Sequence, residues 1–306
     1  MRIVVTGATG TIGSAVCATL HRRGNDVVAL SRDAARARAL LGDGVEVHIW
    51  ARPTDEPPPG RALEGADAVI NLLGEPVAQR WTAAAKQRIR ESRTLTTWQL
   101  VNGLLALSQD LRPKALVSQS ATGFYGPTSA PPIDEQSPAG HDFLAEVVAA
   151  WEAEAMGAEP SVRVVTTRTG VVLSPSGGAL AKMLPFFRAG IGGPVAGGKQ
   201  WVPWVHMDDV VAGLIFCVDD GRARGPVNLV APGAVDNAQL SKALGKALHR
   251  PALLPVPALA LQLLYGEMAE MVTTGQHVIP VRLTDLGFVF RYPELGPALA
   301  DVLGSV

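Results

Sequence analysis

Short apolar runs alternate with helix-like stretches along the first half of the chain. Residues 2–6 form a β-branched run that is typical of a strand buried on both faces. A glycine-rich turn follows, and Ile12, Val16 and Leu20 then recur at every fourth position, which predicts a helix with one apolar face. Residues 26–30 are the next apolar run. The pattern therefore predicts a β-α-β unit, whose two strands belong to a parallel sheet.

The same alternation continues beyond this unit. Further strand-like runs cover residues 45–50, 68–73, 115–118 and 162–166. Helical patterns cover residues 82–108, which are long enough for two helices, and residues 141–155. We therefore expect an α/β fold of the Rossmann type, with a doubly wound parallel sheet.

The alternation loosens after about residue 170. Residues 177–199 are rich in glycine around the apolar run 180–187, which favours a helix set among binding loops. Helix-like patterns then follow near the end of the chain. We expect a dinucleotide-binding domain at residues 1–172, to which 200–232 return, and a smaller C-terminal lobe on the substrate side, made of 173–199 and 233–306.

Composition excludes several classes of protein. The 306 residues are 47% hydrophobic and 18% charged, with 27 Lys and Arg against 28 Asp and Glu, which excludes a disordered chain and argues against nucleic-acid binding. Cys17 and Cys217 are too few for a disulfide framework and are not clustered like metal ligands, so we expect buried thiols, no metal and a reducing compartment. The chain shows neither a membrane-length apolar stretch nor a signal-peptide pattern. We therefore expect a cytoplasmic protein without a membrane partner.

Three evenly spaced glycines follow the first strand. Gly7 suits a tight turn, Gly10 allows a phosphate to approach the backbone, and Gly13 allows the helix to pack closely on the strand. The loop also opens a helix, whose free N–H groups and positive end favour an anion. Because the glycines fall between a strand and a helix, they predict a dinucleotide site rather than a simple turn.

The glycine spacing after Thr6 resembles that of the short-chain dehydrogenase/reductase superfamily, especially its extended branch. The resemblance implies cofactor contacts from the glycine loop, from the end of the fourth strand and from the strand end beside the nicotinamide. These residues are Gly7, Thr9, Gly10, Thr11, Ile12, Gly13, Leu72, Leu73, Gly74, Val171 and Val172.

The end of the second strand points to the type of dinucleotide. It carries Ser31 and Arg32, where an NAD site usually has an acidic residue. A hydroxyl and a guanidinium suit a 2′-phosphate, and we expect no carboxylate there to repel it. We therefore expect NADP(H) rather than NAD(H), with Arg36 or Arg38 as second contacts. The alternative is that Arg32 is an ordinary solvated arginine.

Seven phrases in order narrow the resemblance to one branch. They are NLLGEP (71–76), RW (80–81), SR (92–93), SATGFYG (120–126), MLPFFRAGIGGP (183–194), WVHMDD (204–209) and LGFVFRY (286–292). Together they resemble the atypical "epimerase family" of extended short-chain dehydrogenases, which ends in a segment of unknown function. The resemblance implies that Arg93 contacts a phosphate or ribose, the alternative being a salt bridge on the helix surface. Glu75, Arg80 and Trp81 follow the fourth strand and are candidates for the substrate side.

The acid/base pair that is usual in the superfamily is missing. Tyr125, Tyr265 and Tyr292 are the tyrosines of the chain, and none is followed four residues later by lysine. Ser120 matches the usual catalytic serine and is expected to hold a substrate oxygen. Tyr125 is a candidate replacement acid, the alternative being an aromatic side chain that packs over the cofactor.

The substrate cannot be read from the sequence. Related nucleotide-sugar epimerases place an arginine where this chain has Val202, so the usual anchor for a sugar nucleotide is absent. Trp201 and Trp204 suggest an apolar or planar substrate, and His206 is expected to have a structural role. The leading hypothesis is an NADP(H)-dependent oxidoreductase or epimerase-like enzyme for an unidentified small molecule. The alternative is a non-catalytic NADP(H)-binding sensor or protein-interaction module, and the superfamily resemblance implies a homodimer through residues 82–108 and 141–155.

Overall fold

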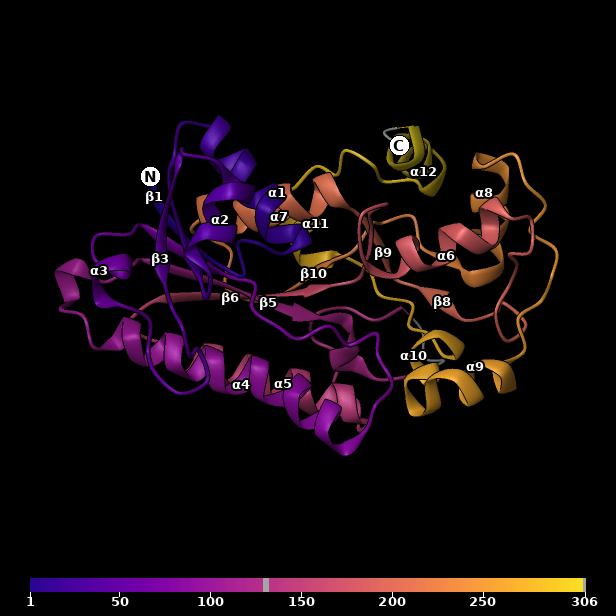
Figure 1. Cartoon of the computed structure of the whole chain (residues 1–306), viewed down its shortest axis with the longest axis horizontal. Coiled ribbons are helices and arrows are strands. Elements are labelled where there is room, and N and C mark those ends of the chain that lie inside the picture. The colour runs from indigo at the N-terminus through magenta and orange to yellow at the C-terminus, as the bar shows by residue number, and fades with distance from the viewer. Residues whose placement is uncertain (129–131, 305–306) are drawn as a thin grey trace.

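A computed structural model describes residues 1–128 and 132–304, and its centre is a parallel sheet of seven strands. The strand order is β10-β6-β5-β4-β1-β2-β3, so the chain winds outward from β1 in both directions (Figure 1). This order confirms the predicted Rossmann-type doubly wound sheet. The strands are β1 (Arg2–Thr6), β2 (Asp26–Ser31), β3 (Val45–Ile49), β4 (Ala68–Asn71), β5 (Ala115–Ala121), β6 (Arg163–Thr169) and β10 (Gly225–Leu229).

Helices cover both faces of the sheet (Figure 1). One layer holds α1 (Thr11–Arg22), α2 (Ala34–Leu41), α7 (Met207–Asp219) and α11 (Val281–Asp285), and the other holds α3 (Gly60–Leu63), α4 (Ala83–Leu105) and α5 (Phe143–Met156). Each layer closes its own hydrophobic core: Leu20 and Leu214 belong to the first, and Leu100 and Leu116 to the second. This two-sided burial explains why the strands read as continuous apolar runs.

Most of residues 82–108, a stretch long enough for two helices, forms the single helix α4. Thr82 accepts the backbone N–H of Ala85 and caps α4, which then runs without interruption from Ala83 to Leu105. No proline lies in this stretch, and its Gly103 packs closely against Pro58. The helix therefore has a cap at its start but no residue that breaks its interior.

The smaller lobe is built from two-stranded sheets and short helices. Strand β7 (Val171–Leu173) pairs with β9 (Trp204–His206), and β8 (Trp201–Val202) pairs with β11 (Val235–Asp236). The helices are α6 (Gly178–Arg188), α8 (Asn237–Ala247), α9 (Ala258–Tyr265), α10 (Glu270–Thr273) and α12 (Leu295–Gly304), with a 3-10 turn at Gly266–Ala269. Two further 3-10 turns, Gln109–Leu111 and Thr122–Tyr125, flank β5 of the main sheet.

A third core, which includes Leu180, Leu244 and Leu299, lies in this lobe. Helix α7 and strand β10 lie with the main sheet, whereas β8 and β9 pair within the smaller lobe, and the division of the chain into two lobes stays a prediction. The last two residues of the expected lobe, 305–306, lie outside the described part of the chain. Across residues 1–128 and 132–304, none of the helices combines the length and apolar character that crossing a bilayer requires.

A buried polar cluster ties the sheet to α4 and α5. The Thr6 hydroxyl donates to the Asn71 side chain at 2.7 Å and accepts the Leu72 N–H at 3.1 Å. The Asn71 amide donates in turn to Thr97 and Ser118, at 3.0 and 3.2 Å. Because Thr6, Asn71, Thr97 and Ser118 are all buried, these bonds fix the level at which β1 and β4 end.

Close packing at Gly13 gives a test of the glycine loop. A Cβ at this position would lie 2.2 Å from the Gly7 carbonyl oxygen and 2.8 Å from the Ala8 Cα, and both are backbone atoms. We expect Gly13→Ala to lower the free energy of unfolding by about 1–3 kcal/mol, because the helix must shift away from the loop. Urea unfolding without added nucleotide measures this.

Gly221→Ala is the matched control, because a Cβ there meets no atom within 4 Å. We expect it to change the free energy of unfolding by less than about 0.5 kcal/mol. Equal stability of the two variants would contradict the close helix–loop contact.

Candidate functional site

The strand ends form one level edge at which the glycine loop lies. Thr6 is opposite both Leu30 and Asn71 in the sheet register, so the residues after β1, β2 and β4 meet there. Gly7 has a positive φ of 64°, and a Cβ on it would lie 2.6 Å from the Leu72 carbonyl oxygen. The loop therefore touches the backbone after β4, and only glycine fits.

The start of α1 remains open for an anion. Gly10 is its N-cap and has no side chain to accept the first N–H groups of the helix, and both Gly10 and Thr11 are exposed. Gly177 lies beside the start of α1, because a Cβ on it would be 2.8 Å from the Thr11 hydroxyl. Uncapped N–H groups, a positive helix end and a backbone without side chains fit a dinucleotide pyrophosphate.

The turn after β2 is more complex than expected. Arg32 is exposed, but the Ser31 hydroxyl donates to the Asp33 carbonyl at 3.0 Å and accepts the Asp33 N–H at 3.2 Å. The expectation that no carboxylate lies in this turn was wrong, because Asp33 is one. Its side chain accepts the Arg36 N–H at 3.0 Å and caps α2, which gives that carboxylate a local partner.

Arg93 holds the loop that follows β4. Its guanidinium donates to the carbonyls of Ile89 and Glu75, each at 3.0 Å, and would lie 3.1 Å from a Cβ on Gly74. Burial lowers the pKa of Arg93 to about 10. The side chain is thus not a surface salt bridge, and its predicted contact with a phosphate or ribose stays a prediction.

A cavity of about 210 Å³ lies between the sheet edge and the smaller lobe. Its apolar walls include Trp81, Phe143, Leu144, Val171, Met183, Trp201 and Val202. Its polar side chains include Thr122, Asp142, Gln200, Asn237, Glu267, Glu270 and Gln276. The cavity therefore brings together three residues predicted from sequence, Trp81, Val171 and Trp201.

Other predicted residues lie away from this cavity. Trp204 is 1% exposed in the core of the lobe, and its indole N–H donates to the Gly233 carbonyl at 2.8 Å. Val172 packs against the sheet core, and Arg80 is exposed. The Glu75 carboxylate accepts from Gln79 at 3.3 Å. Of the predicted substrate-side residues, Trp81 and Trp201 are the pair that lines the cavity.

Ser120 and Tyr125 belong to a buried polar network rather than to the cavity wall. The Ser120 hydroxyl donates to Glu152 at 2.5 Å. The Tyr125 hydroxyl donates to Asn228 at 2.6 Å and accepts from Arg168 at 3.0 Å. Ser120 is 1% exposed and Tyr125 is 4% exposed. Burial raises the pKa of the Tyr125 phenol, so this hydroxyl stays protonated at neutral pH.

An ion pair between Glu152 of α5 and Arg168 of β6 is the centre of this network. Arg168 makes four hydrogen bonds, two to the Glu152 carboxylate at 2.9 Å each, one to Tyr125 and one to the Glu135 carbonyl. Its guanidinium also lies 3.5 Å from the centre of the Phe124 ring. Burial lowers the pKa of Arg168, but Glu152 outweighs that effect and raises it. Arg168 therefore remains charged inside the protein.

The sequence held signals for three residues of the site that went unrecognised. Arg168 lies in a strand of the central sheet, and a charged residue in such a place needs a buried partner, which is Glu152. Thr122 lies in the same phrase as Ser120 and lines the cavity, whereas Ser120 does not.

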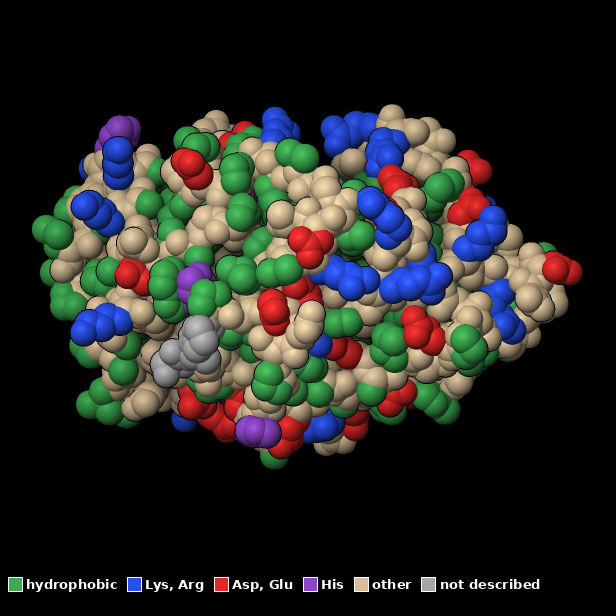
Figure 2. All heavy atoms as spheres, turned by 180° about the vertical axis from the view of Figure 1, so that it is seen from behind, with side chains coloured by type: hydrophobic (Ala, Val, Ile, Leu, Met, Phe, Trp, Pro, Cys, Tyr) green, Lys and Arg blue, Asp and Glu red, His purple; other side chains and the backbone are tan. Residues whose placement is uncertain are grey.

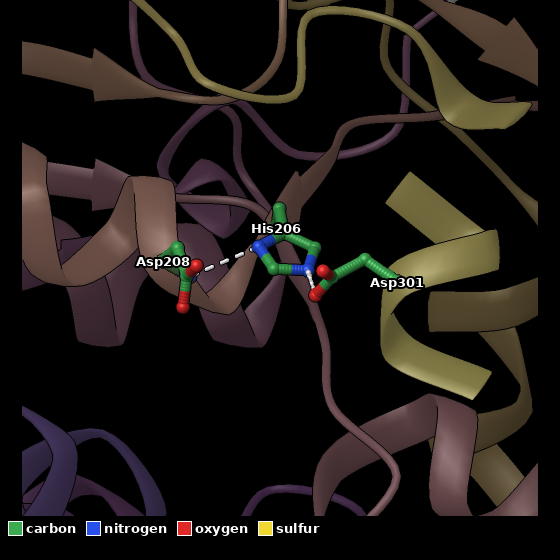
Figure 3. A group of neighbouring side chains, drawn as sticks. All are labelled: His206, Asp208 and Asp301. Atoms are coloured by element: carbon green, nitrogen blue, oxygen red, sulfur yellow. Dashed lines mark hydrogen bonds and ion pairs between the residues drawn. The ribbon is translucent and has the colours of Figure 1, made fainter. Parts of the chain in front are cut away.

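The contacts of His206 agree with the structural role that the sequence predicts for it. Its Nδ1 accepts the Asp208 N–H at 3.0 Å and caps α7, and its Nε2 lies 3.3 Å from the Asp301 carboxylate of α12 (Figure 3). The ring packs 4.0 Å from Tyr292. The spacing of His206, Asp208 and Asp301 would permit a metal ion, but Nδ1 already uses its lone pair as an acceptor. The proton of the neutral ring is then on Nε2, which cannot also coordinate a metal.

Comparisons with known proteins match both parts of the chain. Residues 3–229 match the family model "NAD dependent epimerase/dehydratase family", and residues 256–302 match a domain of unknown function, DUF1731. The epimerase family protein SDR39U1 homolog, chloroplastic, of Arabidopsis thaliana is 38% identical, over 99% of this chain and 87% of its own. The epimerase family protein Mb2239 of Mycobacterium bovis is 38% identical, over 97% of this chain and 96% of its own.

A solved structure agrees with these matches. The crystal structure of human epimerase family protein SDR39U1 (isoform 2) with NADPH has a TM-score of 0.89 and 34% identity, with each chain covered in full. The matches confirm the resemblance predicted from the seven phrases, including the C-terminal segment of unknown function.

The ion pair gives a test of the network. We expect Glu152→Gln and Arg168→Met each to lower the free energy of unfolding by about 3–5 kcal/mol, because each leaves a buried group without its partner. The double variant should lose less than the sum of the two losses, since it leaves no unpaired charge. Urea unfolding of the four proteins measures the coupling.

Arg52→Met is the control, because the Arg52–Glu56 pair is on the surface, with side chains 67% and 39% exposed. We expect it to change the free energy of unfolding by less than about 1 kcal/mol. Additive losses in the double variant would show that Glu152 and Arg168 do not interact.

Proposed function

Because the chain belongs to the NAD dependent epimerase/dehydratase family, we propose that it binds NADP(H) and acts as an oxidoreductase or epimerase-like enzyme on a small molecule in the cavity. The observation that carries the proposal is the open cradle at Gly7, Gly10 and the start of α1, which lies on the same strand edge as the cavity residue Val171. NADPH, which is present in the crystal structure of the human relative, supports the choice of cofactor.

The chain supplies three kinds of contact to this cofactor. Backbone N–H groups of the loop that holds Thr9 and of the helix start at Thr11 and Ile12 bind the pyrophosphate. Arg32 pairs with the 2′-phosphate, and Leu72, Leu73 and Gly74 lie along the nucleotide. Val171 and Val172 adjoin the nicotinamide, which supplies or accepts a hydride when it is bound. Since Val171 also lines the cavity, the cofactor and the substrate would meet at this residue.

Thr122 is the residue of the β5 edge that is placed to hold a substrate oxygen. It lines the cavity, whereas the hydroxyls of Ser120 and Tyr125 are bonded to Glu152, Asn228 and Arg168. In this proposal Ser120 and Tyr125 are positioning residues that hold the strand end, and a water molecule carries the proton to or from the substrate oxygen.

The second candidate is an NADP(H)-binding sensor or interaction module without turnover. It is favoured by the α5 residues that face Gly123, which are apolar: atoms of Leu144 and Val148 would lie 3.6 and 3.9 Å from a Cβ there. Neither side chain can transfer a proton. Binding of NADPH with no oxidation by any of a panel of aldehydes and ketones would select this candidate.

We also propose a homodimer through α4 and α5. Leu95 and Trp98 of α4 are 38% and 48% exposed and lie three positions apart on one face of the helix, so a helix of a second copy would cover both. Light scattering during gel filtration tests the mass in solution, and a monomer at micromolar concentration would remove this proposal.

Arg32 gives a test of the cofactor type. We expect Arg32→Ala to weaken NADPH binding by about tenfold and to leave NADH binding unchanged, because the lost guanidinium contacts a charged group that NADH lacks. Isothermal titration with each nucleotide measures both constants. Arg61→Ala, an exposed arginine on α3, is the control and should leave both unchanged. Equal binding of NADPH and NADH by the native protein would disprove the assignment.

Thr122 gives a test of the oxygen contact. We expect Thr122→Val, which preserves the shape of the side chain, to lower kcat for carbonyl reduction about tenfold or more, with NADPH binding unchanged. Ser120→Ala should instead lower the stability and keep kcat per folded molecule, because it removes a donor from Glu152. The opposite result, with kcat lost in Ser120→Ala alone, would return the catalytic role to Ser120.

A further inference from the structure

The walls of the cavity are flat and apolar. Trp81 and Phe143 meet edge to face with ring centres 5.1 Å apart, and Trp201 stacks on His277 at 4.1 Å. These contacts hold two indole rings in the cavity wall, one from the loop after β4 and one from β8. Ring faces fixed in this way favour a flat apolar molecule, which loses little water-exposed polar surface on entry.

Among the described residues, all the charged side chains that line the cavity are acidic. Asp142, Glu267 and Glu270 line it, and no described lysine, arginine or histidine does. The Asp142 carboxylate accepts the Ala145 N–H at 2.7 Å, and Glu267 pairs with Lys86 at 2.6 Å. Within the described residues no such contact engages the carboxylate of Glu270, which is exposed. A negative charge therefore remains at the rim of the cavity.

Lys86 does not supply a positive charge to the interior. Its Nζ lies 4.8 Å from the centre of the Phe143 ring and 6.0 Å from that of Trp81, and its charge is paired with Glu267. The face of the molecule in Figure 2 has many Lys and Arg side chains over the half that contains the sheet. The basic residues of the chain are thus not gathered in this cavity.

We infer that the cavity takes an uncharged, flat, apolar aldehyde, ketone or alcohol and excludes anions. The inference rests on the proposed function, since Thr122 would hold the oxygen of this molecule. Val202 lines the cavity at the place expected of a phosphate-binding arginine, so a nucleotide sugar would lack a cation for its pyrophosphate and meet the Glu270 carboxylate. The carboxylate of Glu270 and the aromatic rings of the cavity wall select together for an uncharged substrate.

The test uses two probes of similar shape and different charge, 2-naphthaldehyde and 6-formyl-2-naphthoate. Quenching of tryptophan fluorescence in the full chain saturated with NADP⁺ measures the binding of each. We expect the uncharged probe to bind at least about tenfold more tightly than the anion. Equal or tighter binding of the anion would overturn the inference.

Two variants show whether the carboxylate causes this preference. Glu270→Lys should strengthen binding of the anion relative to that of the uncharged probe at least about threefold. Glu64→Lys, an exposed site on the turn after α3, should change neither. An unchanged preference in Glu270→Lys would overturn the role of the rim.

The same titrations separate this inference from the proposed function. If NADPH binds but neither probe does, the inference about substrate class fails and the cofactor site stands. If NADPH does not bind, the proposed function fails. If a matched cationic probe, 2-naphthylmethylamine, binds more tightly than the aldehyde, the preference for an uncharged molecule is overturned in favour of a cation.

Discussion

The buried ion pair between Glu152 and Arg168 is the interaction on which the geometry of the site depends. It joins α5 to β6, and through Ser120, Tyr125 and Asn228 it extends to β5, the turn after it and β10. A buried ion pair is stable only when its remaining donors and acceptors are also bonded, which is why neighbouring hydroxyls point toward it. Their orientation therefore follows from a need for polar partners in the core.

This constraint explains how one helix can keep its place in the fold without the usual acid/base pair. Near the cavity, α5 presents Leu144 and Val148 to Gly123, so the contact there is apolar. Two turns along the chain the same helix presents Glu152 to the network. Glu152 of α5 therefore has a role in the core. The hydroxyl group that lines the cavity at the end of β5 is that of Thr122.

The extent to which the sequence predicted the site depends on how local each contact is. The glycine loop was predicted residue by residue because Gly7, Gly10 and Gly13 act through their own backbone. The capping role of Asp33 is also local, but it was not predicted, because the residues that distinguish NADP(H) from NAD(H) sites are those of the strand end, Ser31 and Arg32. By contrast, Tyr125 meets Asn228 across 103 positions in sequence, and Ser120 meets Glu152 across 32. No periodicity reports such pairs, so the direction of those two hydroxyls required the structure.

The two sides of the cleft come from different parts of the chain. Residues within 3–229 supply the glycine loop and the cavity residues Trp81, Thr122 and Trp201, whereas Glu267 and Glu270 lie within residues 256–302, the second matched segment. The Lys86–Glu267 ion pair joins the two parts. Under the proposed function, a substitution of Glu270 in the C-terminal segment would change which substrate is accepted without disturbing the glycine loop. The proposed charge selectivity and the proposed cofactor site are therefore separable in this architecture.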